Sequence, residues 1–143
     1  TVFTNNVNAA LDLGEPGFHY CFTGGEFQSR SNSLAGRFAL DNLNLVFANK
    51  VILGVDGISL KHGCTVPTNA EAEVVRKMIE RTKGQVIVVA DHSKWGAVSN
   101  FPVASIDEVD KFVTDEGFGK SAIQDLADHS VETLIASNAS TTA

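Results

Sequence analysis

The sequence has few cysteines, no excess of positive charge and no long apolar run, and each shortage excludes a class of protein. Two cysteines in 143 residues cannot form a disulfide framework, so Cys21 and Cys64 indicate reduced thiols of a cytoplasmic protein. None of the four histidines has the spacing to either cysteine that a zinc site requires. With 11 Lys and Arg against 17 Asp and Glu, the chain lacks the basic face of a nucleic-acid-binding module. No apolar stretch reaches the roughly 18 residues that cross a bilayer.

What the chain does contain is enough apolar sequence for one globular domain, in which short strands alternate with helices. The expected strands are 1–4, 18–23, 50–56, 85–91, 111–115 and 132–136. The expected helices are about 6–13, 33–45, 68–83, 105–109 and 120–128. Segments 26–32 and 57–67 are expected as loops, and residues 137–143 as a disordered tail. This alternation predicts an α/β fold of three layers, with a mainly parallel sheet flanked by helices and with 50–56 and 85–91 as central strands.

Three of the expected strands end on an acid, and one of them leads directly to a lysine. Asp56, Asp91 and Asp115 close their strands, and Lys94 follows Asp91 by three residues. Because parallel strands share one carboxyl edge, these side chains should gather there, where open α/β folds bind ligands. Carboxylates accept sugar hydroxyls, and an ammonium group attracts phosphate. The edge therefore favours a phosphorylated, polyhydroxylated ligand.

Several stretches, taken in order, resemble a known family. They are TVFTNN, TGGEFQSRSNSLAG, KVILGVDGIS, HGCTVPTNAEAEVVRKMI and ADHSKWG. Together they resemble the C-terminal effector-sensing domain of the DeoR family of bacterial sugar-metabolism repressors, over about residues 1–136. The resemblance implies an N-terminally truncated sensor. An earlier strand, an Asp-Gly-Thr-Thr-like phosphate loop and a winged helix-turn-helix that binds operator DNA would all lie outside this sequence.

The resemblance also implies a fold similar to pentose-phosphate isomerases and CoA-transferase-like proteins, and so raises an enzyme as the rival function. The isomerase order of motifs recurs as Gly54-Val55-Asp56, Lys61-His62-Gly63, Glu71 and 90–94. However, Leu53 stands where those enzymes carry a further aspartate, and Cys64 and Thr65 interrupt the glycine loop. An isomerase needs a positioned base and an electrophile. The pattern therefore indicates a binding pocket without catalytic residues, needing neither metal nor cofactor.

Lys94, Asp56 and Glu71 are the leading candidates for ligand contact, and two of them have an alternative structural role. Lys94 follows a buried strand, which favours contact with the anionic group of the effector over surface decoration. Asp56 precedes Gly57 and fits either a ligand site or the start of a turn. Glu71 stands three residues after Thr68 and fits a capping box, with ligand contact as a second role.

Asn5, Gly25 and Thr65 complete the expected ligand site. Asn5 fits either a hydrogen bond to a sugar hydroxyl or a helix cap, and Gly25 either close approach to phosphate or a turn. Thr65 is a candidate for contact with a phosphate or hydroxyl. The sequence thus predicts a sugar-phosphate sensor that works as a cytoplasmic homo-oligomer, reaches DNA only through its missing domain and does not enter a membrane.

Overall fold

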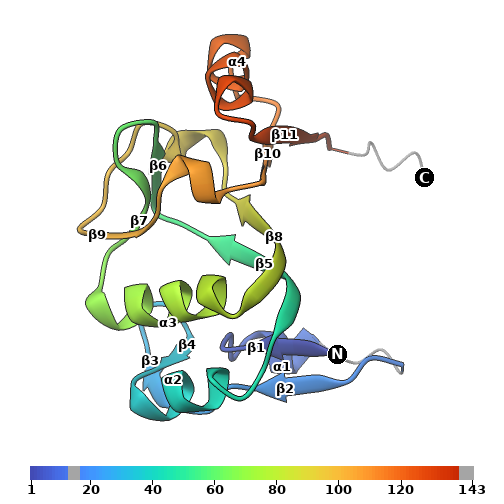
Figure 1. Cartoon of the computed structure of the whole chain (residues 1–143), viewed down its shortest axis with the longest axis vertical. Coiled ribbons are helices and arrows are strands. Elements are labelled where there is room, and N and C mark those ends of the chain that lie inside the picture. The colour runs from blue at the N-terminus through green and yellow to red at the C-terminus, as the bar shows by residue number, and fades with distance from the viewer. Residues whose placement is uncertain (13–16, 139–143) are drawn as a thin grey trace.

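The computed structural model describes residues 1–12 and 17–138, and its centre is a parallel sheet of four strands. The strands are β5 (Ala48–Gly54), β8 (Thr82–Val89), β10 (Lys111–Asp115) and β11 (Glu132–Ala136), in the order β11-β10-β8-β5. Three helices flank the sheet (Figure 1): α2 (Arg37–Leu43), α3 (Asn69–Glu80) and α4 (Lys120–Asp128). The predicted α/β class is confirmed, and the arrangement is consistent with three layers.

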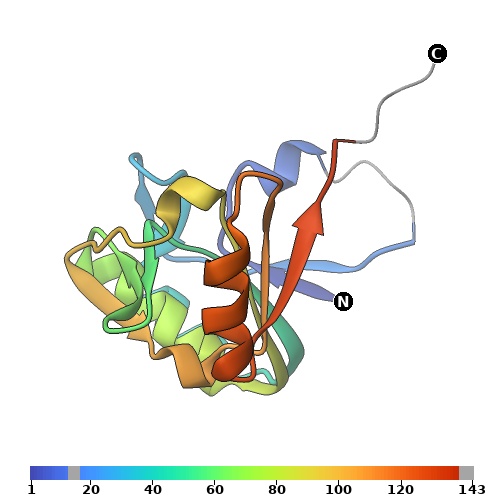
Figure 2. The ribbon, with the colours of Figure 1, turned by 90° about the horizontal axis from the view of Figure 1, so that it is seen from above.

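The helices take their places because each buries an apolar stripe. Val75, Met78 and Ile79 of α3 pack on buried side chains of β5 and β8. Leu126 of α4 lies in the main core with Phe112 of β10, and neither is exposed to solvent. Figure 2 shows α4 running beside β10 and β11, and α2 packs on α3 at the other end of the sheet. The core therefore lies between the sheet and the helices that cover one of its faces.

The other face of the sheet remains open at β5. Val51 and Leu53 are buried, whereas Ile52 between them is 70% exposed. Val88 of β8 is buried, and Val89 after it is 43% exposed. Strand β5 also lies at the edge of the sheet, with β8 as its only partner among the described residues. The prediction of a central strand at 50–56 is therefore wrong for this chain, because the apolar run has a covering on one face only.

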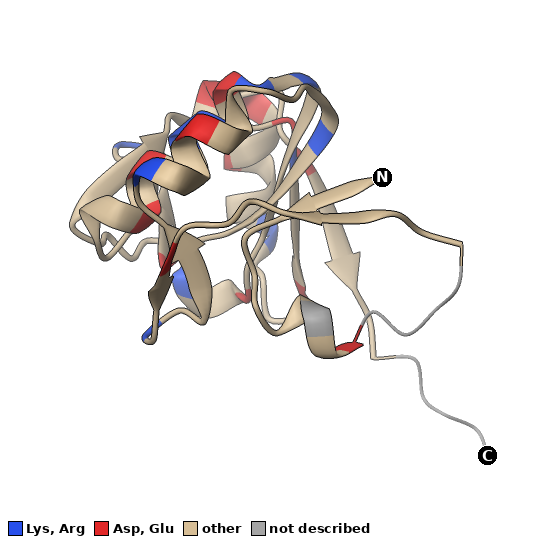
Figure 3. Ribbon diagram, turned by 90° about the horizontal axis from the view of Figure 1, so that it is seen from below, with Lys and Arg blue, Asp and Glu red and all other residues tan. Residues whose placement is uncertain are grey.

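Three small sheets extend the molecule. They are β1 (Val2–Thr4) parallel to β2 (Tyr20–Phe22), the hairpin of β3 (Glu26–Gln28) and β4 (Ser33–Ala35), and the antiparallel sheet of β6 (Gly57–Ser59), β7 (Gly63–Val66) and β9 (Phe101–Ala104). A short helix, α1 (Ala9–Asp12), lies between β1 and β2 in the chain. The ribbon of β1 and β2 carries no Lys, Arg, Asp or Glu (Figure 3). The two expected loops, 26–32 and 57–67, are therefore wrong, since both contain strands paired by contacts that a short polar or glycine-rich sequence does not reveal.

Helix boundaries follow the sequence where a capping residue is present. Thr68 caps α3 by accepting the backbone N–H of Glu71 at 3.3 Å, as predicted. The helix expected over 33–45 instead begins after Gly36, because 33–35 pair as β4. Gly84 does not end α3 as expected. It lies in β8, where a Cβ would come within 2.0 Å of the carbonyl oxygen of Asn49.

The last three expected elements agree with the structure. The bounds of β10, α4 and β11 agree with the predicted 111–115, 120–128 and 132–136, and the turn at 105–109 contains a 3-10 helix, η2 (Ile106–Glu108). Most of the expected tail lies outside the described residues. No described helix is both long enough and apolar enough to cross a membrane.

Candidate functional site

The carboxyl ends of three parallel strands lie at one level. Gly54 pairs with Val89, and Val89 pairs with Val113, so these residues form one row across β5, β8 and β10. The three acids that the sequence placed at the strand ends each stand two residues beyond this row: Asp56, Asp91 and Asp115. Strand register therefore places the three residues just beyond the same edge of the sheet, and a carboxylate oxygen of Asp91 lies within 4.8 Å of one of Asp115.

Lys94 is held at this edge by a single turn of 3-10 helix, η1 (His92–Lys94). Asp91 caps the turn, because its Oδ1 accepts the backbone N–H of Ser93 at 2.8 Å and also the Ser93 hydroxyl. These bonds, with the positive charge of Lys94, lower the pKa of Asp91 below its usual value. Lys94 is half-buried, and its backbone N–H returns to the Asp91 carbonyl at 3.1 Å. A fixed turn thus places a cation beside a carboxylate.

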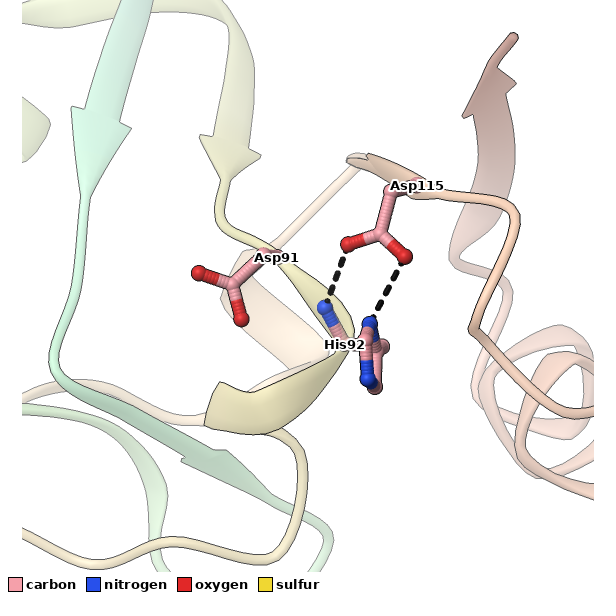
Figure 4. A group of neighbouring side chains, drawn as sticks. All are labelled: Asp91, His92 and Asp115. Atoms are coloured by element: carbon pink, nitrogen blue, oxygen red, sulfur yellow. Dashed lines mark hydrogen bonds and ion pairs between the residues drawn. The ribbon is translucent and has the colours of Figure 1, made fainter. Parts of the chain in front are cut away.

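His92 and Asp115 join the ends of β8 and β10. Asp115 Oδ1 lies 2.7 Å from His92 Nδ1, and its Oδ2 accepts the His92 backbone N–H at 2.9 Å (Figure 4). The Gly117 N–H also donates to Asp115 Oδ1, at 2.8 Å. The backbone N–H groups of His92 and Gly117, followed by the His92 side chain, lower the pKa of Asp115 from 3.8 to about 2. Asp115 is therefore an anion that fixes the orientation of the imidazole.

The lowered pKa of Asp115 predicts a specific loss of stability in acid. Because the folded protein binds this proton less readily than the unfolded chain, the carboxylate stabilises the fold fully above the ordinary pKa of 3.8. That contribution should decline as the pH falls and disappear as it passes about 2. Chemical denaturation of wild type and Asp115→Asn over this range should give a difference in unfolding free energy that vanishes at low pH. A difference unaffected by pH would show that Asp115 does not titrate as described.

The same three side chains would satisfy a distance criterion for a metal site, since one ligand atom from each of Asp91, His92 and Asp115 lies within 4.8 Å of the others. Their hydrogen bonds, however, already engage most of these ligand atoms. Nδ1 of His92 and both oxygens of Asp115 are engaged with each other and with backbone N–H groups, and Asp91 holds Ser93. The arrangement is a closed hydrogen-bonded junction between two strands.

Asp56 and Thr65 reach the edge through the sheet of β6, β7 and β9. The Asp56 N–H donates to the Thr65 carbonyl at 3.0 Å, and the Gly96 N–H after Lys94 donates to the carbonyl of Ile58 at 2.8 Å. The Thr65 hydroxyl accepts the Ser99 N–H at 2.8 Å and is 2% exposed. Thr65 thus ties the chain after Lys94 to this sheet, while Asp56 is exposed.

Glu71 makes only half of the predicted capping box. Its backbone N–H bonds to Thr68, but its Oε2 is buried with no hydrogen-bond partner among the described residues. A carboxylate oxygen removed from water without a donor costs free energy. The first turn of α3 therefore buries a carboxylate oxygen whose hydrogen-bonding capacity is unused among the described residues.

Asn5 and Gly25 lie apart from the four-stranded sheet, on the segment of β1 to β4. The Asn5 side-chain amide donates to the Leu34 carbonyl at 3.1 Å, which links the end of β1 to β4. Gly25 has a φ of +118°, and a Cβ there would lie 2.4 Å from the Ala35 carbonyl oxygen. Both residues thus have structural contacts, and their contact with a ligand stays a prediction.

A cleft of about 900 Å³ separates β1 from the edge strand β5. All of β1 and most of β5 line it, from Thr1 to Asn6 on one side and from Ala48 to Gly54 on the other. Neither Lys94 nor the three edge acids line this cleft. Its position along two strand edges distinguishes it from the site at the strand ends.

The sequence placed His92 near the site, at the end of a strand, but gave it no role, and it named Asp91 and Asp115 only as edge acids. The common signal of the two acids is register, since each stands two positions beyond a row of paired strand residues. The bond from Asp115 to His92 depends on the approach of two loops, for which no local pattern exists.

Comparison with known proteins gives a consistent result. The model of the DeoR C-terminal sensor domain matches residues 1–116. The HTH-type transcriptional repressor GlcR of Bacillus subtilis is 36% identical over 137 residues, which cover 94% of this chain and 52% of that protein. The glycerol-3-phosphate regulon repressor of Escherichia coli is 32% identical over 132 residues, 92% of this chain and 52% of that protein. The chain therefore spans about half the length of these relatives.

Proposed function

Because this chain belongs to the family of DeoR C-terminal sensor domains, we propose that it binds a phosphorylated sugar at the carboxyl ends of β5, β8 and β10. The chain is a regulatory domain of transcriptional repressors and not an enzyme. The observation that carries the proposal is the common level of Asp56, Asp91 and Asp115, with Lys94 in the turn that follows β8. This site combines acceptors for hydroxyl groups with a cation for phosphate.

Each group has a distinct task in the proposed complex. The Lys94 ammonium pairs with the phosphate, as a point charge on a flexible stem. The exposed carboxylate of Asp56 accepts sugar hydroxyls, and the buried Oε2 of Glu71 gains a donor, which none of the described residues gives it. The binding energy is then divided between one charged contact and several oriented hydrogen bonds, which is the arrangement that discriminates between sugars.

Binding would regulate transcription by shifting the repressor between two states. In the full-length protein, an N-terminal winged helix-turn-helix would hold operator DNA, and the effector would favour the released state. A ligand shifts such an equilibrium only by its difference in affinity for the two states, typically about 1–3 kcal/mol.

We further expect a homo-oligomer. Strand β11 leaves one edge unpaired among the described residues, and its Leu134 and Ile135 are each 41% exposed.

A thermal-shift screen tests the proposed ligand class. We expect five- and six-carbon sugar phosphates and glycerol phosphate to include a compound that raises the melting temperature by several degrees. A ligand at about 100 times its Kd contributes about 2.7 kcal/mol to stability. The same sugars without phosphate are the matched controls, and should give a smaller shift. Equal shifts with and without phosphate would contradict a phosphate site, and no shift in the full-length protein would contradict the proposed function.

We also infer that a strand from a segment preceding Thr1 fills the cleft between β1 and β5. The relatives are about twice as long as this chain, which leaves room for such a segment. Strand β1 pairs with β2 alone and β5 with β8 alone among the described residues, so each offers an unused edge to the cleft. A strand there would join the two sheets into one and place β5 in its interior. The expected central position of 50–56 would then hold in the longer protein.

A further inference from the structure

The side chain of His92 lies at the site, but the proposed function gives it no role. Its ring lies against Gly117, since a Cβ on that glycine would come within 2.5 Å of Nδ1, 2.7 Å of Cε1 and 2.8 Å of Cγ. Asp115 holds the same ring through Nδ1, and the backbone N–H of His92 through its second oxygen. A residue without a side chain and a carboxylate from the next strand together fix one ring orientation.

This orientation leaves the other ring nitrogen available. Figure 4 shows Nε2 on the side of the ring away from Asp115, and the described residues give it no hydrogen bond. The His92 side chain is 54% exposed. In a neutral ring, the bond from Nδ1–H to Asp115 would leave Nε2 as an acceptor, and a protonated ring would make it a donor. An anionic ligand would select between these two forms of the ring.

The charges around His92 favour the protonated form when phosphate binds. The charged groups beside the ring are Asp115 from β10 and Asp91 from its own turn, with Lys94 two residues further along that turn. A phosphate at this edge would meet three carboxylates and a single ammonium. A second cation is therefore needed to balance the ligand, and histidine is the side chain that ordinarily gains charge between pH 5 and 8.

We propose that His92 is a second ligand-contacting cation, which takes up a proton from solvent when phosphate binds and donates from Nε2 to a phosphate oxygen beside Lys94. Asp115 compensates the new charge through Nδ1–H, and Gly117 keeps the ring in place. This role rests on the proposed function and specifies it further, because proton uptake would make effector affinity rise as the pH falls toward 6.

Histidine labelled with ¹³C at Cε1 in the full-length protein gives a direct test. At neutral pH, inorganic phosphate or fructose 6-phosphate should move the His92 Hε1 resonance toward its imidazolium position. His129 is an internal control, since its Nδ1 makes a similar bond to Asp107 at 3.1 Å after the far end of α4, and its resonance should not move. A His92 resonance that stays neutral while the probe binds would overturn the proposal.

Two substitutions distinguish the contact of His92 with the ligand from the positioning of its ring. His92→Gln should weaken binding of the probe by about tenfold, the scale of a charge-assisted hydrogen bond, and abolish proton uptake measured by calorimetry in buffers of different ionisation enthalpy. Gly117→Ala should push the ring aside and lose proton uptake although the histidine is still present. His129→Gln should bind as wild type does. Unchanged proton uptake in either site variant would overturn the role of His92, whereas a wild type that binds neither probe would contradict the proposed function itself.

Discussion

Lys94→Ala should weaken binding of the phosphorylated effector by about tenfold or more. Lys94 is half-buried in a turn fixed by Asp91, and no salt bridge among the described residues holds its ammonium group. A charge-assisted contact with phosphate in such a place contributes roughly 1.5–3 kcal/mol. Since about 1.4 kcal/mol corresponds to a tenfold change in Kd, titration calorimetry on the full-length protein should resolve the loss. Folding should be unaffected, because η1 is closed by backbone bonds that alanine retains.

Lys83→Ala is the matched control for that loss. Lys83 lies in the same strand, β8, near its opposite end, where its ammonium sits 4.1 Å from the centre of the Phe47 ring. The substitution removes the same charge and should leave effector affinity unchanged. In the proposed repressor, Lys94→Ala should still bind operator DNA and should be released poorly by effector. Equal affinities of Lys94→Ala and wild type would show that Lys94 is a surface residue with no part in binding.

The part of the site that the sequence predicted is the part encoded locally. A buried strand that ends on Asp91 and leads to Lys94 can be found from apolar patterning, and parallel pairing then brings Asp115 to the same edge. Thr68 likewise predicted the start of α3 correctly. The sequence did not predict that the Glu71 side chain would be buried without completing the capping box, because its burial depends on segments distant in the sequence.

The errors of fold prediction have a common physical cause. Strands β6, β7 and β9 are three or four residues long, and β7 pairs with β9 across 35–40 residues of sequence, from Val66 with Phe101 to Cys64 with Ala104, which a local pattern cannot indicate. Gly84 has the residue type of a helix end, yet it serves the close approach of β8 to Asn49 of β5. Tertiary contact, and not propensity, decided each of these positions.

The edge position of β5 was the largest departure from expectation, and it leads to a test in two lengths of the protein. Ile52 is 70% exposed and lines the cleft between β1 and β5. In the chain described here, Ile52→Asn should change the unfolding free energy by no more than about 0.5 kcal/mol, as is usual at a surface. If a preceding strand fills the cleft, the same substitution in the longer protein removes a buried side chain worth about 1.5–3 kcal/mol and buries an amide in its place.

The cost of Ile52→Asn should therefore rise from nearly nothing in the short chain to about 3 kcal/mol in the long one, as measured by urea denaturation of both lengths. Val98→Asn is the control, because Val98 is also exposed, at 55%, but lies in the loop before β9 and does not line the cleft. Its small effect should be the same in both lengths. An equally small cost of Ile52→Asn in both would mean that β5 remains an edge strand, and that the residues preceding Thr1 are folded elsewhere. A large cost confined to the longer protein would place β5 inside a continuous sheet, with the cleft as the position of the added strand.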